Sequence, residues 1–138
     1  MITNKQLHQL VRFGLSGVAG FIVDASLVAL CAQVYSIGPV LAQVIAFSVA
    51  VTVTWIINRY WTFAENASKN WIPEFARYLA ANSIGATINN STYLLLVVLL
   101  SIFRDNPTYA VAVGSLAGMI SNFIMSRQYA FRSERTTC

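Results

Sequence analysis

The sequence predicts an all-α membrane protein with four transmembrane helices, and its composition is the first reason. Hydrophobic residues make up 57% of the 138 residues and charged residues only 10%, whereas an ordinary soluble domain has about 25% charged residues. Such a small number of charges cannot cover the surface of a soluble globule. A chain this apolar does not remain disordered either. The length suits a single membrane domain over residues 1–138.

Four apolar segments are the second reason. They cover residues 13–34, 40–58, 79–102 and 109–126, and each comes close to or exceeds the ~20 residues that cross a bilayer. The first segment is too long for the apolar core of a signal peptide and carries Asp24, so we expect it to be retained. Thr3 and Gln6 have the spacing of a capping box, which predicts a short helix leading into this segment.

The positions of the basic residues predict the orientation. Only Arg104 falls in a connection on the opposite side from the termini. The other basic residues lie in the N-terminal arm, between the second and third segments, and in the C-terminal tail: Lys5, Arg12, Arg59, Lys69, Arg77, Arg127, Arg132 and Arg135. The positive-inside rule then places both termini in the cytoplasm. The net charge of +4 is explained by orientation, so we expect no nucleic-acid partner.

The two halves of the chain resemble each other, which predicts two repeats of two helices, over about residues 11–63 and 76–131. An offset of 65 aligns Asp24 with Asn89, and an offset of 68 aligns Asn58-Arg59 with Ser126-Arg127. Because each repeat contains two spans, both repeats point the same way. Their pseudo-axis then runs along the membrane normal.

Small residues recur every fourth position in the second and fourth segments, as in Gly114 and Gly118. Stripes of this kind let helix backbones approach closely in lipid, so we expect them to pack the helices together. The same two glycines are also a candidate contact between copies of the chain in a homo-oligomer, or a docking face for a partner.

Asp24 lies about 18 Å along the first helix from Arg12, close to the middle of a bilayer. A carboxylate at that depth costs about 2.5–3.5 kcal/mol on insertion scales, so it must face the bundle or a wet cavity. One interpretation is a structural hydrogen bond to another helix, for example to Asn89 or Asn90. The other is a polar step in a substrate path, or a proton site.

Asn58-Arg59 and Ser126-Arg127 end the second and fourth segments at the cytoplasmic face. The two arginines are ordinary topology anchors in one interpretation. In the other, the pseudo-axis brings them together and their guanidinium groups bind a phosphate with paired donors. Trp61 and Tyr129 follow at matching positions, either as interface anchors or as stacking surfaces for a sugar.

Several chemistries have no basis in the sequence. It contains no G-x-x-x-x-G-K-[ST] loop for ATP. The one histidine, His8, has no cluster of further ligands for a metal and no Ser/His/Asp set around it. We therefore expect no enzyme activity, no cofactor and no metal site.

These residues resemble the GtrA-like family of small four-span membrane proteins. The resemblance is carried by residues 12–14 (R-F-G), Gly20, Asp24 and residues 58–63 (N-R-Y-W-T-F), with a second copy at residues 122–123 and 127–131. It covers about residues 11–131. The resemblance implies a role in cell-surface polysaccharide synthesis at the cytoplasmic membrane.

Members are thought to move polyprenyl-phosphate-linked sugars to the outer leaflet, or to assist the glycosyltransferase that makes them. We therefore expect translocation (flipping) of a lipid-linked sugar phosphate, with the glycosyltransferase as a membrane partner. The expected substrate-binding residues are Asp24, Asn58, Arg59, Asn89, Asn90, Asn122 and Arg127. Recruitment of the glycosyltransferase without transport is the alternative. A proton-coupled exporter is a third, although the strong charge bias favours a single orientation.

Overall fold

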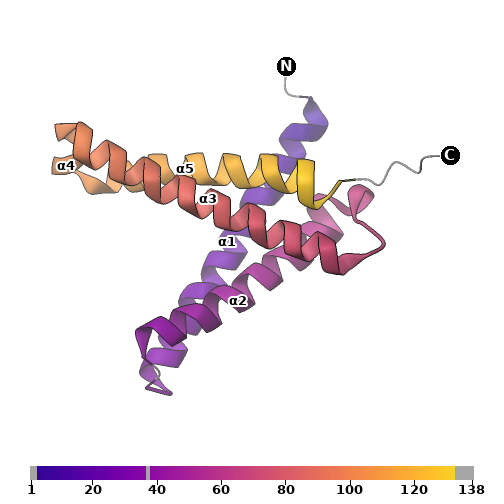
Figure 1. The fold of residues 1–138 in the computed structure, drawn as a ribbon, viewed down its shortest axis with the longest axis horizontal. Coiled ribbons are helices and arrows are strands. Elements are labelled where there is room, and N and C mark those ends of the chain that lie inside the picture. Colours follow the sequence, from indigo (N-terminus) through magenta and orange to yellow (C-terminus); the bar gives the residue numbers. More distant parts are fainter. Residues whose placement is uncertain (1–2, 37, 133–138) are drawn as a thin grey trace. The chain divides into compact units, whose positions relative to one another are not determined.

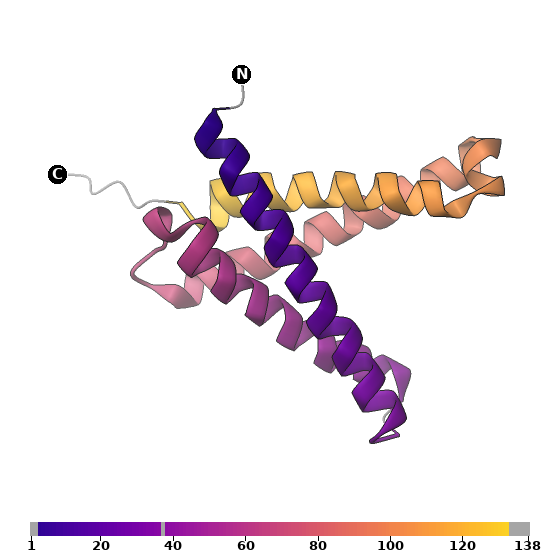
Figure 2. The ribbon, with the colours of Figure 1, turned by 180° about the vertical axis from the view of Figure 1, so that it is seen from behind.

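The computed structural model describes residues 3–36 and 38–132, and within these ranges it is helical with no strand. The chain divides into two compact units, Met1–Ala67 and Ser68–Cys138. Each unit is built around a pair of long antiparallel helices that lie side by side, as Figures 1 and 2 show.

The first unit contains α1 (Asn4–Gln33) and α2 (Pro39–Ile57), followed by the π-helical turn η1 (Asn58–Thr62) and the 3₁₀ turn η2 (Ala64–Asn66). The predicted capping box is confirmed. Thr3 Oγ1 accepts from Gln6 N at 3.3 Å, and Gln6 Oε1 accepts from Thr3 N at 3.0 Å. It begins α1 itself, because no helix breaker separates the N-terminal arm from the apolar segment.

The second unit contains α3 (Trp71–Leu99), the short α4 (Ser101–Asp105), α5 (Pro107–Met125) and the π-helical turn η3 (Ser126–Ala130). Arg104 turns back onto the end of α3, where its Nη2 donates to Val98 O at 2.8 Å. It therefore satisfies one of the carbonyl groups that a helix end leaves without a partner. Both α2 and α5 begin at a proline, whose fixed φ suits the first helical position.

Three helices are long and apolar enough to cross a membrane, namely Asn4–Cys31, Val40–Thr62 and Pro107–Ala130. The protein is therefore a multi-pass membrane protein. The predicted third span corresponds to α3, which has 29 residues but no stretch apolar enough to place it among these three. The polar residues responsible are Asn82, Ser83, Thr87, Asn89, Asn90, Ser91 and Thr92. The count of four spans thus stays a prediction.

The small-residue stripes are buried, as their spacing predicts. Ala42 and Ala46 of α2 are fully buried, and so is Ala110 of α5. On α5, a Cβ atom at Gly114 would lie 2.7 Å from Asn89 Oδ1, and one at Gly118 would lie 2.9 Å from Gly85 O. The two glycines therefore serve contact between α5 and α3 inside one unit. They are not the contact between copies or the docking face that the sequence offered, because α3 covers them.

Candidate functional site

A π-helical turn ends the second long helix of each unit, and the two turns lie at corresponding positions of the chain. In η1, Phe63 N donates to Asn58 O at 2.8 Å, and in η3, Phe131 N donates to Ser126 O at the same distance. Each pairing joins residues five apart, which is the π-helical pattern often found at functional sites. The repeated motif is visible in the sequence, but its π-helical form is not.

A buried aromatic ring holds each turn in place. Phe63 packs against Phe13 of α1 with ring centroids 6.1 Å apart, and Phe131 packs against Tyr78 of α3 with centroids 5.8 Å apart. Phe63, Phe131 and Tyr78 are almost completely buried. The residues between helix and ring, which include the predicted arginines, are thus anchored at both ends.

Arg59 is half-buried among aromatic side chains of its own unit. Its guanidinium carbon lies 5.6 Å from the ring centroid of Trp55 and 5.9 Å from that of Tyr60. At these distances the cation is attracted to the ring faces. The guanidinium is therefore held near the turn at the C-terminal end of α2.

Trp61, a predicted interface aromatic, is paired with an arginine from α1. The Arg12 guanidinium carbon lies 5.5 Å from the Trp61 ring centroid, and Arg12 Nη1 donates to Trp61 O at 3.2 Å. Trp61 nevertheless keeps 43% of its surface exposed. Arg12 positions this ring, and the sequence analysis had given it only a topological role.

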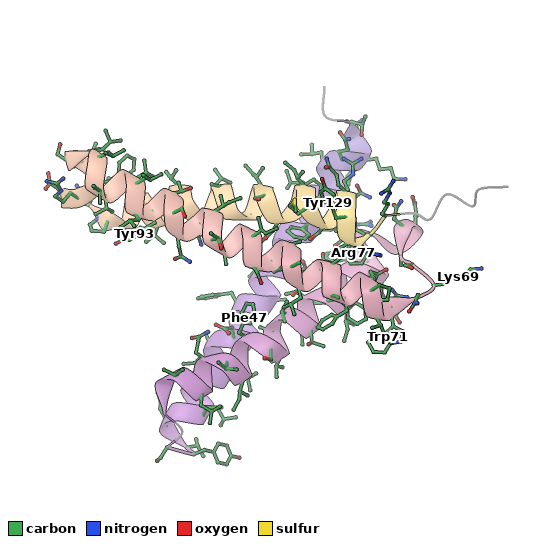
Figure 3. All side chains as sticks on the ribbon, in the orientation of Figure 1. Phe47, Lys69, Trp71, Arg77, Tyr93 and Tyr129 are labelled. Atoms are coloured by element: carbon green, nitrogen blue, oxygen red, sulfur yellow. The ribbon has the colours of Figure 1, made fainter. Side chains whose placement is uncertain are left out.

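Arg127 and Tyr129 are the corresponding residues of the second unit, and both are exposed. Figure 3 shows Tyr129 at the same end of the second unit as Arg77, with Tyr93 toward the opposite end. Arg127 therefore differs from Arg59, whose charge lies against aromatic rings. The two arginines belong to different units, and their joint action on one phosphate stays a prediction.

Asn58 is fully buried and paired within the first unit. Ser16 Oγ donates to Asn58 Oδ1 at 2.9 Å and also lies 2.8 Å from Phe13 O. Ser16 has only 2% of its surface exposed. The sequence analysis did not single out Ser16 as a partner, although its spacing from Gly20 and Asp24 places it on the same stripe.

Buried polar atoms without a partner occur near the π-helical turns of both units. Within the residues that the structure describes, three buried side-chain oxygens have no hydrogen-bond partner: Thr62 Oγ1, Asn122 Oδ1 and Ser126 Oγ. Asn122 of α5 and Ser126, the first residue of η3, are four residues apart and lie on the same stripe. Such atoms are costly inside a protein, and each needs an explanation such as a bound molecule or water.

Asn89 and Asn122 share the seam between α3 and α5, whereas Asn90 does not. The Asn122 side chain lies directly over Gly85, and Asn89 lies over Gly114 and Gly118. Asn90 is exposed, and its Nδ2 donates to Ala86 O of its own helix at 2.9 Å. The seam therefore brings together two of the three predicted asparagines of this unit.

Asp24 lies apart from the π-helical turn of its unit. It is eight residues beyond Ser16, or about 12 Å along α1. Its partner is Gln43 of α2, whose Nε2 lies 3.4 Å from Oδ1 and 3.5 Å from Oδ2. Asn89 and Asn90 were the partners expected from the sequence, whereas the observed partner, Gln43, belongs to the same unit as Asp24.

One ion pair lies near the N-terminal end of the first unit. Lys5 Nζ of α1 donates to Glu65 Oε2 of η2. This hydrogen bond, together with the charge of Lys5, lowers the pKa of Glu65 below its usual value of 4.5. The pair ties the start of α1 to the segment that follows the π-helical turn.

Comparison with known proteins identifies one family. Residues 12–131 match the family described as GtrA/DPMS, transmembrane domain. A comparison with curated proteins gives no significant match. The matched range includes every residue of the candidate site, and this domain indicates a role in membrane-linked glycan synthesis.

Proposed function

Because the chain belongs to the GtrA/DPMS transmembrane domain family, we propose that it flips a polyprenyl-phosphate-linked sugar across the cytoplasmic membrane. The step is transport rather than an enzymatic reaction, and it serves cell-surface polysaccharide synthesis or glycosylation. The substrate has an apolar tail that stays in lipid. Only its sugar and its phosphodiester charge must cross the hydrocarbon.

The observation that supports this proposal best is the arginine that follows a buried polar residue in each unit. Arg59 follows the buried Asn58, and Arg127 follows the buried Ser126, both on π-helical turns at the ends of apolar helices. A guanidinium group binds phosphate with paired, charge-assisted donors. Such groups at the membrane interface suit the capture of a lipid phosphate.

The buried polar side chains supply the next contacts along the path. Asn122 Oδ1 and Ser126 Oγ are acceptors without a partner among the described residues. Sugar hydroxyl groups are donors that fit them. Asn89 lies on the same seam of the second unit, farther from the π-helical turn, and extends this polar surface.

The orientation and the energetics are part of the same proposal. We place both termini in the cytoplasm and α3 in the membrane as the third of four spans, since no charged residue occurs between Arg77 and Arg104. An inside-negative potential then favours outward movement of the phosphodiester anion by about 2.3 kcal/mol per 100 mV. Transport by this route needs no ATP.

The test is a leaflet-accessibility assay in liposomes that contain the purified chain and a polyprenyl-phosphate-linked sugar. An impermeant reagent reports how fast the sugar equilibrates between leaflets. We expect faster equilibration than in empty liposomes, and its loss in the Arg59→Ala/Arg127→Ala variant. Arg77→Ala is the matched control, because it removes an exposed basic residue near the start of α3. Normal transport by the double variant contradicts the role of the two arginines.

A second candidate function is recruitment of a glycosyltransferase without transport. The observation in its favour is an exposed pair at the start of α3, where Trp71 and Ile72 are 54% and 62% exposed. Copurification of a glycosyltransferase that is lost in Trp71→Ala, from protein that gives no transport in liposomes, supports this function over flipping.

A further inference from the structure

One face of α3 is polar and exposed, although we place this helix in the membrane. Ser83, Thr87 and Asn90 are spaced four and three residues apart, which puts them on the same face. All three are exposed in the structure. A polar face in contact with hydrocarbon is costly, so it calls for a physical explanation.

Each of these side chains donates a hydrogen bond to its own helix. Ser83 Oγ donates to Leu79 O at 3.0 Å, Thr87 Oγ1 to Ser83 O at 2.9 Å, and Asn90 Nδ2 to Ala86 O at 2.9 Å. The hydroxyl protons are thereby used internally. The oxygen lone pairs remain, so the face is left mainly with hydrogen-bond acceptors.

The first unit has no such face at the corresponding place. The offset of 65 that aligns α3 with α1 puts Val18, Ile22 and Ala25 opposite these three residues. Val18 and Ile22 are 57% and 59% exposed, as expected for an ordinary lipid-facing surface. The helical hairpin therefore does not itself require polar residues at these positions.

We propose that Ser83, Thr87 and Asn90 form an acceptor ladder that binds the hydroxyl groups of the sugar while it crosses the membrane. This inference rests on the proposed function. The ladder extends about 10 Å along α3, which is enough for successive hydroxyl groups to change partners in steps. Its occupant is a neutral, hydroxyl-rich headgroup, because a phosphate anion has no protons to donate to these acceptors. The ladder and Arg127, which belong to the same unit, thus recognise different parts of one substrate.

The test compares binding of two probes to the detergent-solubilised full chain by native mass spectrometry. One probe is polyprenyl-phosphate glucose and the other is polyprenyl phosphate without a sugar. The variant Ser83→Ala/Thr87→Val/Asn90→Leu is expected to lose about tenfold in affinity for the glucose lipid, as expected when such hydrogen bonds are lost. Its affinity for the bare lipid is expected to stay unchanged. Circular dichroism checks that the variant keeps its helices.

Ser48→Ala/Thr52→Val is the matched control. These two hydroxyl groups also donate to carbonyl groups of their own helix, α2, to Val44 O at 2.7 Å and Ser48 O at 2.8 Å. We expect this variant to keep its preference for the glucose lipid. An equal loss in the control, or an equal loss for both probes, overturns the ladder.

A change of oligomeric state in the triple variant, with unchanged lipid binding, also overturns the ladder and identifies a second copy as the occupant of this face. Binding in detergent does not depend on flipping. A wild-type chain that prefers the glucose lipid through these residues but gives no transport in liposomes therefore refutes the proposed function and supports the ladder. If the triple variant keeps its preference for the glucose lipid and still transports the sugar, the ladder is refuted and the proposed function is supported.

Discussion

The Ser16 hydroxyl donates to Asn58 Oδ1 at 2.9 Å, and this contact joins α1 to the π-helical turn that follows α2. Both side chains are buried. The corresponding residues of the second unit are Ala81 and Ser126, and Ser126 Oγ has no partner among the described residues. The two units therefore differ in the hydrogen bonding of the buried residue that precedes each arginine. The pair Ser16–Asn58 is hydrogen-bonded, whereas the Ser126 hydroxyl at the corresponding position is unsatisfied among the described residues; the first unit has its own unsatisfied hydroxyl at Thr62, further along its turn.

Ser16→Ala removes the hydroxyl donor from Asn58 Oδ1 in a site that water does not reach. We expect a loss of about 1 kcal/mol in the free energy of unfolding, typical of a hydrogen bond between membrane helices. Thermal unfolding in detergent, followed by circular dichroism, measures the change. Ser48→Ala is the control, because that exposed hydroxyl bonds only its own helix, and we expect an effect within about 0.5 kcal/mol. Equal stability of both variants contradicts the importance of the Ser16 contact.

Gly85 allows the Asn122 side chain to lie against the backbone of α3. A methyl group at this position would overlap the Asn122 amide, whereas one at Gly17 of α1 would meet nothing within 4 Å. We expect Gly85→Ala to destabilise the protein by about 1–3 kcal/mol through overpacking. Gly17→Ala is expected to stabilise it by up to about 1 kcal/mol, since alanine favours the helix. Unfolding midpoints in one detergent compare the two.

A second substitution distinguishes this clash from a general effect on α3. Asn122→Ala removes the group that the new methyl overlaps, so the Gly85→Ala/Asn122→Ala variant is expected to recover most of the stability lost by Gly85→Ala. No recovery means that the methyl group disturbs another contact.

The sequence predicted the helices, because apolar run lengths and capping residues are local signals. The capping box at Thr3 and Gln6 and the buried stripe at Ala42, Ala46 and Ala110 follow from spacing alone. The outer connection was less predictable, since α4 and the Arg104 contacts depend on where α3 ends. Polar residues in α3 weaken its apolar signal, and the span predicted there is not among the three that the structure supports.

The candidate site was predicted by residue type more than by contact. The motif at residues 58–63 identified Arg59, but its spacing carries no signal for a π-helical turn or for the rings of Trp55 and Tyr60 around the guanidinium. Gln43 was missed as the partner of Asp24, because a contact between two helices depends on how they pack. Which side chains pair between two helices can be read only from the three-dimensional structure.

The ion pair of Glu65, which lies outside the membrane-spanning segments, predicts that the stability of the protein depends on pH. Its folded-state pKa lies below 4.5 because of Lys5. The ion pair therefore contributes stability above about pH 4.5, and the contribution is lost as the pH falls through the folded-state pKa. The effect is small because both side chains are exposed. We expect Glu65→Gln to lower the unfolding midpoint slightly at pH 7, and the difference from the wild type to shrink as the pH is lowered below 4.5. A difference that does not shrink with falling pH argues against the ion pair as its cause.

Glu74 fixes the connection that leads into α3. Its carboxylate is fully buried, and Oε2 accepts from Ser68 N at 2.6 Å. Glu74→Ala leaves that buried amide without its acceptor, so we expect a loss of about 1–3 kcal/mol in the free energy of unfolding. Glu74→Gln keeps an acceptor oxygen of similar reach and is expected to lose less. Thermal unfolding compares the two variants, and equal losses point to the negative charge rather than the hydrogen bond.

Substitutions of Asp24 distinguish two roles for this side chain, a polar step in the substrate path and a proton site. Its partner Gln43 is a neutral amide, and the corresponding residue of the second unit, Asn89, is also neutral. A position that needs only polarity tolerates an amide, so we expect Asp24→Asn to keep lipid-linked sugar transport within about twofold of the wild type, a difference below 1 kcal/mol in the barrier. Asp24→Leu removes the polar group and is expected to slow transport clearly. The liposome assay, run at pH 6 and pH 8, measures both variants. Complete loss of transport in Asp24→Asn, together with loss of its pH dependence, identifies Asp24 as a proton site and favours a proton-coupled exporter over a flippase driven by the membrane potential.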